Sequence, residues 1–386
     1  MIRKLNLLVL LVALGGVVGL VAFMNREQVR GGGGKEKVVR IKGKMMRLYG
    51  DEPYTLAELA RHVADPDLLS YDPERREAVA KASLVVHGGL RIGDPEDRRK
   101  GETLVLDTVV CGDLRLEVAP EGRLEVYHSD IRTKTMKMTA DACSLGYFFF
   151  VDGRLEAADS RFLYMSGSGS KTAKEGSSVA LEDVVFALAD GCAFHTDDAD
   201  GARMDIRDST FSCEGQFGFL AEGSSGKPIV LRRCKLVGQL ADLALRGRGA
   251  QVELIDCGFA PSKVKFYHRS GRATVRWTVR ARVVTQGGGE PVPGATVAAT
   301  STGEGPAETI EARTGEDGTC RLVLTDYVAT PEAPLPMPGV NDVTPHRLVV
   351  RSAAGKVLAE RPAYRASGPE DELVLEVPAQ ALTASR

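Results

Sequence analysis

One pattern comes back along this chain at a nearly fixed interval. Each copy reads apolar-x-apolar-x-polar, with a large apolar residue three positions after the polar one. The five clearest copies span residues 155–162, 179–186, 204–211, 229–236 and 252–259. Counted from the first apolar residue, successive copies are 24, 25, 25 and 23 residues apart. A period of this size is typical of a solenoid, in which each repeat buries its apolar face only by stacking on its neighbours.

A second kind of segment shows that the repeat is built from strands. Short apolar runs follow the large apolar residue of each copy, at residues 193–195, 217–219, 243–245 and 264–266. Upstream, similar runs divided by glycine or charged turns lie at residues 84–86, 90–92, 104–106, 114–116 and, in an earlier copy, 124–131. Two or three strands in about 24 residues predict a coil of a parallel β-helix, because helical repeats have longer periods.

These copies carry a resemblance. Residues 84–272, about half of the chain, resemble the right-handed parallel β-helix superfamily, which includes the pectate-lyase-like proteins. The resemblance implies the fold and says little about activity, because this scaffold serves polysaccharide lyases, hydrolases, adhesins and inert surface proteins.

The pattern changes after Gly271. Residues 275–283 alternate strictly between apolar and polar, with arginine and threonine on the polar side, as in a strand with one face in water. Further runs complete the set of strands that a β-sandwich needs, at residues 291–297, 314–322, 347–350 and 373–377.

Two of these segments resemble a known domain. The segment 291–297, which reads PVPGATV, and the turn at 314–318 resemble the carboxypeptidase regulatory-like, transthyretin-like β-sandwich. The resemblance covers residues 275–378 and implies that the first segment is a strand-turn-strand opening and not a catalytic element. We therefore expect an antiparallel sandwich over residues 273–378, followed by a short tail over 379–386.

The first 24 residues predict contact with a membrane. Arg3 and Lys4 precede residues 7–24, where eighteen residues run without a charge. As a helix this run is about 27 Å long, close to the hydrocarbon thickness of a bilayer. A retained signal anchor and a cleaved signal peptide both stay open over residues 1–24.

The orientation in that membrane also stays open. The leading charges resemble an export signal, whereas seven lysines and arginines between residues 26 and 44 form a basic flank that the positive-inside rule places in the cytoplasm. We expect export, by analogy with the two domain types.

Residues 25–83 are expected to form a linker and a small helical cap on the front of the β-helix. The glycines of 31–34 predict a flexible joint. Thr55 and Glu58 match a capping box ahead of an apolar helix face, and a second short helix is expected over residues 73–81. Such a piece covers the core and the strand edges that a first coil leaves open.

Charge and cysteine content narrow the possible partners. A net charge of −2 gives no reason to expect nucleic acid, whose partners usually have a basic face. Cys234 and Cys257 hold the same place in consecutive copies, so they are expected to stack one above the other. A disulfide and a ladder of small buried side chains both stay open. The ladder is favoured because Ser129, Ser160 and Ser209 fill that place elsewhere.

The best candidate site is a carboxylate-rich turn directly after one strand. Asp197, Asp198 and Asp200 offer hard oxygen ligands for Ca²⁺, or an acid and a base for a glycosidic bond. The alternative is a solvated acidic turn closed by Gly201, since aspartate is among the commonest turn residues. No motif assigns a catalytic residue or a firm metal ligand.

The aspartates of the repeat itself have a simpler interpretation. Asp159, Asp183, Asp208 and Asp256 share the polar position of the pattern. We interpret them as structural residues that bond turn amides between strands. Arg233 takes the same position in one copy and reduces the repulsion between stacked carboxylates.

Together these observations predict an all-β protein: a right-handed parallel β-helix with a small N-terminal helical cap, followed by a C-terminal antiparallel β-sandwich. The expected function is that of a non-enzymatic surface or scaffold protein of a bacterial-type cell envelope, held on the extracytoplasmic side through residues 7–24 and binding polysaccharide along the β-helix. The alternative is a carbohydrate-active enzyme, a polysaccharide lyase or glycoside hydrolase, that uses the Asp197–Asp200 turn.

Overall fold

The computed structural model describes most of the chain in two units. The described residues are 28–31, 37–108, 114–134, 146–170, 178–196, 203–223, 227–303, 307–336, 341–366 and 368–380. One compact unit contains residues 1–168 and 176–178, and the other contains residues 169–175 and 179–386. Among the described residues, no helix has the length and apolar character needed to cross a membrane, and residues 7–24 lie outside them.

The first unit is built from short strands, one α-helix and a 3-10 turn. Its elements are β1 (Gln28–Gly31), β2 (Val38–Lys42), β3 (Met45–Tyr49), β4 (Pro53–Tyr54), α2 (Leu56–Val63), β5 (Leu69–Asp72), β6 (Glu77–Ala80), β7 (Ser83–Val86), β8 (Gly89–Ile92), η1 (Arg98–Lys100), β9 (Thr103–Leu106), β10 (Arg115–Val118), β11 (Arg123–Tyr127), β12 (Asp130–Thr133), β13 (Tyr147–Val151) and β14 (Arg154–Leu163). Strand β15 (Met165–Ser170) contains residues of both units.

Three strands make one coil in this unit. Strands β7, β8 and β9 form one coil, β10, β11 and β12 the next, and β13 with the long β14 the third. Each strand pairs in parallel with its counterpart in the next coil, as β7 does with β10 and β10 with β13. The same holds for β8, β11 and β14, and for β9, β12 and β14. The prediction of an all-β fold with stacked parallel strands is confirmed.

The N-terminal segment contains one of the two expected helices among its described residues. Helix α2 begins after a capping box, in which the amide of Glu58 donates to the Thr55 hydroxyl at 3.3 Å and the amide of Thr55 donates to the Glu58 carboxylate at 3.1 Å. The prediction of a second helix over residues 73–81 is wrong. That stretch forms a turn and strand β6, which pairs antiparallel with β5 and parallel with β9.

Strands also occupy the segment that was expected to hold only linker and helix. Strand β3 pairs antiparallel with β2 and parallel with β7, so stacking on the coils begins before residue 84. Gly31 pairs with Val38 across β1 and β2 and therefore belongs to a strand, whereas the glycines at 32–34 lie outside the described residues.

The second unit continues in strands to the end of the described chain. Its elements are β16 (Ser178–Ala189), β17 (Cys192–Thr196), β18 (Arg203–Arg207), β19 (Thr210–Cys213), β20 (Phe217–Glu222), β21 (Ile229–Arg232), β22 (Lys235–Gly238), β23 (Ala241–Arg246), β24 (Gln251–Ile255), η3 (Pro261–Lys263), β25 (Val264–Phe266), β26 (Arg272–Thr285), β27 (Thr296–Ser301), β28 (Thr309–Arg313), β29 (Thr319–Ala329), β30 (His346–Arg351), β31 (Val357–Tyr364) and β32 (Asp371–Val377).

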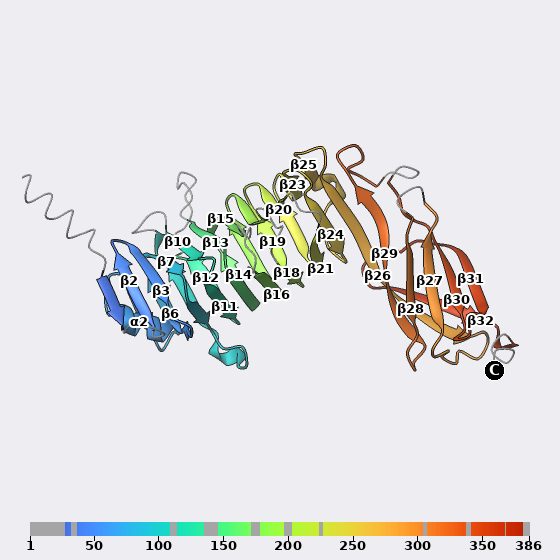
Figure 1. Cartoon of the computed structure of the whole chain (residues 1–386), viewed down its shortest axis with the longest axis horizontal. Coiled ribbons are helices and arrows are strands. Elements are labelled where there is room, and N and C mark those ends of the chain that lie inside the picture. Colours follow the sequence, from blue (N-terminus) through green and yellow to red (C-terminus); the bar gives the residue numbers. More distant parts are fainter. Residues whose placement is uncertain are drawn as a thin grey trace, which may run out of the picture. The chain divides into compact units, whose positions relative to one another are not determined.

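The sequence repeat is the register of the parallel strands in this unit. Leu231 of β21 pairs with Ile206 of β18 and with Leu254 of β24, which are the same position in three successive copies. Phe211 of β19 pairs with Leu236 of β22 in the same way. The segments expected as second strands are β17, β20, β23 and β25, and they pair in parallel in that order. Figure 1 shows β20, β23 and β25 next to one another.

The polar position of the repeat is a corner with a left-handed backbone. Its φ lies between 46° and 55° in six copies, at residues His128, Asp159, Asp183, Asp208, Arg233 and Asp256. This conformation strains most residues and is tolerated best by glycine, asparagine and aspartate. The corner therefore explains why aspartate recurs at this position.

The carboxylates at this corner mostly bond side chains of neighbouring copies instead of turn amides. Asp208 accepts two hydrogen bonds from the Arg233 guanidinium, at 2.6 and 2.7 Å. Asp159 lies 2.9 Å from Nδ1 of His128. Asp256 accepts from the amide of Thr278 at 2.7 Å, so it alone in this set bonds a backbone amide among the described contacts. The proposed relief of repulsion by Arg233 is confirmed as an ion pair.

The residue after the corner forms the predicted ladder of small side chains. The Ser129 hydroxyl donates to the carbonyl two residues before it at 2.6 Å, and the Ser129 amide donates to Ser160 Oγ of the next copy at 3.2 Å. Cys234 and Cys257 occupy the same place, are both buried, and have free thiols. A hydrogen bond between these thiols raises the pKa of Cys257 well above its ordinary value. The ladder, not the disulfide, is what the structure contains.

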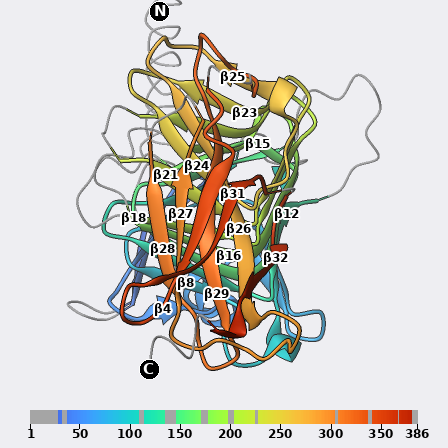
Figure 2. The same ribbon diagram turned by 90° about the vertical axis from the view of Figure 1, so that its right-hand side faces the viewer.

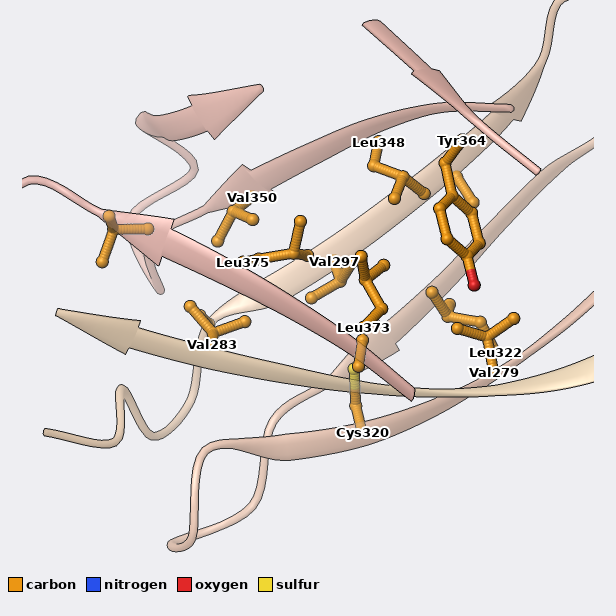
Figure 3. Close-up of a cluster of buried hydrophobic side chains, with 14 of the residues drawn as sticks. Val279, Val283, Val297, Cys320, Leu322, Leu348, Val350, Tyr364, Leu373 and Leu375 are labelled. Atoms are coloured by element: carbon orange, nitrogen blue, oxygen red, sulfur yellow. The ribbon is translucent and has the colours of Figure 1, made fainter. Parts of the chain in front are cut away.

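The C-terminal strands form two layers around one apolar core. Strands β28, β27, β30 and β31 make an antiparallel four-stranded sheet, part of which faces the viewer in Figure 2. The other layer contains β29, β26 and β32. Side chains from both layers meet in the core drawn in Figure 3, where Val283 and Leu322 of one layer lie close to Val297 and Val350 of the other.

Candidate functional site

The strand that leads to the predicted acidic turn is described, and the turn is not. Strand β17 ends at Thr196, and Asp197, Asp198 and Asp200 lie outside the described residues. Their role as ligands for Ca²⁺ or as acid and base stays a prediction. Among the residues that the structure describes, no group of three or more histidines, cysteines and carboxylates is arranged to hold a metal ion.

The outer face of β17, β20, β23 and β25 brings together side chains that are far apart in the sequence. Parallel strands in register put paired residues on the same face of a sheet. His195, Leu220, Ala244 and Lys265 are paired in this way and form one row across the four strands. Phe194 next to His195 points the opposite way and is fully buried in the core. The row containing His195 therefore points away from that core, with His195 accessible and its middle members Leu220 and Ala244 covered.

A polar cluster lies at one end of this outer face. Nε2 of His195 donates to one carboxylate oxygen of Glu222 at 2.9 Å. Nε of Arg246 lies 3.5 Å from the other oxygen of the same carboxylate. The side chains of His195, Glu222 and Arg246 are 27%, 29% and 61% exposed. The three groups are thus paired with one another and still accessible to a ligand.

Apolar and aromatic side chains adjoin this cluster. Leu220, Ala241 and Ala244 form a small apolar cluster, and Phe217 packs against it. The rings of Phe217 and Tyr267 meet edge to face with centroids 5.9 Å apart. Tyr267 is 54% exposed, which is unusual for a large aromatic side chain unless it serves an interface. The face therefore combines an aromatic pair with the polar cluster of His195, Glu222 and Arg246.

This arrangement suits a ligand with apolar and hydroxylated sides. An aromatic ring offers an apolar surface on which a flat ligand face can pack. A carboxylate accepts hydrogen bonds from hydroxyl groups, whereas a guanidinium donates them. The pairing of Glu222 with His195 and Arg246 holds the carboxylate in one place, so less side-chain entropy is lost when a ligand binds.

Sequence reasoning found the four strands of this face but missed Glu222 and Arg246, whose side chains meet there. Glu222 and Arg246 follow position 197 at steps of 25 and 24 residues, the same period as the repeat. Counting the period forward from the acidic turn, and not only along the apolar pattern, would have found both residues. The signal for Tyr267 is weaker, because the last copy is followed by a different spacing.

A second polar group, in the first unit, has a structural explanation. Glu125 of β11 has a side chain only 5% exposed and lies 2.5 Å from Nε of Arg91 and 2.6 Å from Nη2 of Arg123. A buried carboxylate with two guanidinium partners is neutralised, and removing a partner would leave an unpaired buried charge. This group therefore ties β8 to β11 and is not a candidate site.

Strand alternation divides the side chains of the Tyr147–Phe150 run between the two faces of β13. Tyr147 and Phe149 are fully buried in the core. Phe148 and Phe150 are half-buried on the other face, where their rings stack with centroids 6.1 Å apart.

Comparison with known proteins gives little further information. No protein-family model matches the chain, and no curated protein matches it. Among solved structures, the chain is similar to a mutant of the periplasmic alginate epimerase AlgG, with 13% sequence identity and a TM-score of 0.30. The match covers 62% of this chain and 65% of that protein. At this TM-score the likeness carries no argument about activity.

Proposed function

We propose that the protein is a carbohydrate-binding protein of the cell envelope and that its ligand lies on the outer face of β17, β20, β23 and β25. The observation that carries the proposal is the aromatic pair of half-buried Phe217 and exposed Tyr267 beside the cluster of His195, Glu222 and Arg246. A sugar ring has an apolar face that packs on an aromatic ring and hydroxyls that bond carboxylate and guanidinium groups.

The repeating nature of the face supports a polymeric ligand. Successive coils place their outward side chains at a constant strand spacing of about 4.8 Å. A linear polysaccharide also presents its units at regular intervals, so several sugar units can contact the face at once. Binding through many weak contacts of this kind gains strength from multivalency.

Affinity measurements on the folded protein test this proposal. Binding of the part that follows residue 24 to a panel of neutral glycans and polyuronates is measured by affinity electrophoresis and calorimetry. Tyr267→Ala and Glu222→Gln are each expected to weaken binding about tenfold or more, since each removes one exposed contact group. Phe148→Ala, at a half-buried aromatic side chain of the first unit, is the matched control and should leave affinity unchanged.

Two results would remove the proposal. One is that no glycan in the panel binds, and the other is that Tyr267→Ala binds as tightly as the wild-type protein. Unfolding curves of each variant show whether a loss of binding comes from a loss of folding.

A second candidate function is catalysis on the same class of ligand. The observation that favours it is the 2.9 Å contact between His195 and Glu222, which is the geometry of an acid–base pair. Glycoside hydrolysis requires a second carboxyl group, for which Asp197, Asp198 and Asp200 are the sequence candidates. Incubation with the same glycans and Ca²⁺, followed by detection of unsaturated or reducing ends, separates the two functions. Cleavage that Glu222→Gln abolishes would establish an enzyme.

The surroundings of the protein are part of the proposal. We place it on the extracytoplasmic side of a bacterial-type membrane, tethered through residues 7–24, with polysaccharide or other envelope components as partners. We also propose that the stacked coils form a right-handed β-helix with a helical cap. Residues 273–378 are proposed to form a carboxypeptidase regulatory-like sandwich. A reporter fused to the C-terminus, active only outside the cytoplasm, tests the orientation.

A further inference from the structure

A hollow lies on the outer face of the layer formed by β29, β26 and β32. Its volume is about 300 Å³. The residues that line it are Arg280, Arg282, Asp317, Thr319, Glu372, Leu373 and Val374. The hollow is therefore a concave surface with two guanidinium groups, two carboxylates, a hydroxyl and apolar side chains, a mixture that small-ligand sites share.

The alternation of β26 explains why arginines line the hollow. Val279, Ala281 and Val283 point into the core between the two layers and are fully buried. Because successive side chains of a strand point to opposite faces, Arg280 and Arg282 lie on the outer face. Strand β26 pairs with β29 on one side and β32 on the other, so the arginines occupy the middle of this layer.

The arginines of the hollow lie beside carboxylates but form no ion pair among the described residues. Neither Arg280 nor Arg282 makes a hydrogen bond or ion pair with any described residue, whereas Arg276 of the same strand lies 3.2 Å from Glu253. Glu372 pairs in register with Arg280, and the charge of Arg280 adds to the hydrogen bonds from Thr319 that lower the pKa of Asp317. Arg280 is also directly opposite Arg321 of β29, and like charges directly opposite each other destabilise a sheet. The guanidinium groups therefore keep donors that no described residue accepts from.

The other lining groups indicate what kind of anion fits. Hydrogen bonds from Thr319 occupy the carboxylate of Asp317 and hold its pKa below the ordinary value. Glu372 is paired in register with Arg280. The planar carboxylate of a ligand matches the guanidinium groups of Arg280 and Arg282, each of which can donate hydrogen bonds to it. Glu372 then accepts from ligand hydroxyls, and Val374, which is 59% exposed, offers an apolar contact.

We propose that this hollow binds an acidic sugar. Arg280 and Arg282 donate hydrogen bonds to the carboxylate of the sugar, and Glu372 accepts hydrogen bonds from the hydroxyls of its ring. The site is separate from the outer face of β17, β20, β23 and β25 and does not depend on the function proposed for that face. A uronate is the simplest ligand of this class, because it joins one carboxylate to a ring of hydroxyls.

Calorimetric titration with glucuronate tests the inference. The wild-type protein is expected to bind glucuronate and to bind glucose and inorganic phosphate at least about tenfold more weakly, since glucose lacks the carboxylate and phosphate lacks the hydroxylated ring that Glu372 and Val374 contact. Arg280→Gln and Arg282→Gln are each expected to weaken glucuronate binding at least about tenfold. Arg272→Gln, at the start of the same strand and away from the hollow, is the control and should bind like the wild type.

Folding of the variants provides a second measurement. Arg280→Gln removes the repulsion from Arg321 together with the attraction to Asp317 and Glu372, so its unfolding midpoint without ligand should stay close to that of the wild type. A lower midpoint would mean that the charge has a structural role, and it would overturn the inference. Equal binding of phosphate, or no binding of glucuronate, would overturn it too. If Tyr267→Ala abolishes glucuronate binding while Arg280→Gln does not, the ligand lies on the β-helix face and this inference is wrong.

Discussion

At the scale of single residues, the backbone at the corner decides which side chains the repeat contains. Asp183 has a φ of 55°, is exposed, and makes no hydrogen bond or ion pair with a described residue. Asp208 has almost the same φ and also bonds Arg233. The conformation is common to both, and the bond is not. The left-handed corner is therefore the first cause of the recurring aspartate, and the contacts of its carboxylate come second.

Substitution at Asp183 isolates this backbone effect. Asp183→Ala is expected to lower the free energy of unfolding by about 1 kcal/mol, because alanine is strained in the left-handed region. Asp183→Gly should cost less, since glycine adopts that region without strain. Denaturant unfolding measures both. Asp205→Ala is the control, an exposed strand position that loses the same charge; an equal loss there would attribute the effect to charge.

Asp326 is a half-buried carboxylate at a break in the strand pairing. Val275 pairs with Tyr327 and Arg276 with Thr325, so Asp326 is an extra, bulged residue of β29. Its carboxylate accepts from Nε1 of Trp277 at 3.2 Å. Burial raises the pKa of Asp326 above its ordinary value of 3.8, although Trp277 and Arg365 oppose this shift.

This shift predicts how Asp326→Asn changes stability with pH. A raised pKa in the folded state means that folding favours the protonated form. The stabilising contribution of Asp326 is therefore complete below pH 3.8 and is lost as the pH rises through the raised value. The variant keeps the acceptor for Trp277 and never ionises. It should equal the wild type below pH 3.8 and exceed it increasingly at higher pH. A constant difference at all pH values in thermal unfolding would contradict the prediction.

At the scale of elements, strand alternation assigns side chains to the core more reliably than local signals assign helices. In residues 147–150 the alternation of the strand puts Tyr147 and Phe149 in the core and Phe148 and Phe150 on the other face. The helix expected over residues 73–81 does not form, because an aspartate such as Asp72 can stand at the start of a helix or in a turn. Its carboxylate accepts from the amides of Glu74 and Arg75, a bond that begins a helix or closes a turn. Pairing of β6 with β9, far along the chain, made it a turn.

Two substitutions in β13 test whether only one face of that strand supports the core. Phe149 is fully buried and its ring stacks on Phe162 with centroids 5.1 Å apart. Phe149→Ala should lower the free energy of unfolding by about 3–5 kcal/mol, as loss of a core aromatic side chain does. Phe148→Ala, at the adjacent half-buried position, should cost about 1 kcal/mol or less. Similar losses in chemical unfolding would mean that both rings support the core.

At the scale of the whole molecule, the second unit has no clean boundary at residue 272. Strand β26 begins as the last parallel strand on β24, through residues 272–276. The same strand then pairs antiparallel with β29 and parallel with β32. The β-helix coils and the C-terminal layers therefore share one strand, and the C-terminal layers cover the edge of β24.

Truncation tests this dependence. A chain that ends at Gly271 lacks β26, so β24 has an open edge with unpaired amides and carbonyls, and such edges promote aggregation. We expect a lower thermal midpoint and loss of soluble protein. A chain that ends at Gln380 lacks only the last six residues and should unfold like the full chain. If the chain ending at Gly271 keeps the full-length midpoint, the two regions are independent.

The sequence by itself determined the repeating strands, their register and the core positions, because stacking forces equivalent residues to occupy equivalent places. It also determined the small-residue ladder at Ser129, Ser160, Cys234 and Cys257. Only the tertiary structure decided which outward side chains meet. The sequence separates Glu222 from His195 by 27 residues and Tyr267 from Phe217 by 50, and no local pattern marks them as neighbours. Stacking of the coils brings each pair into contact, because adjacent strands lie about 4.8 Å apart whatever the length of the chain between them.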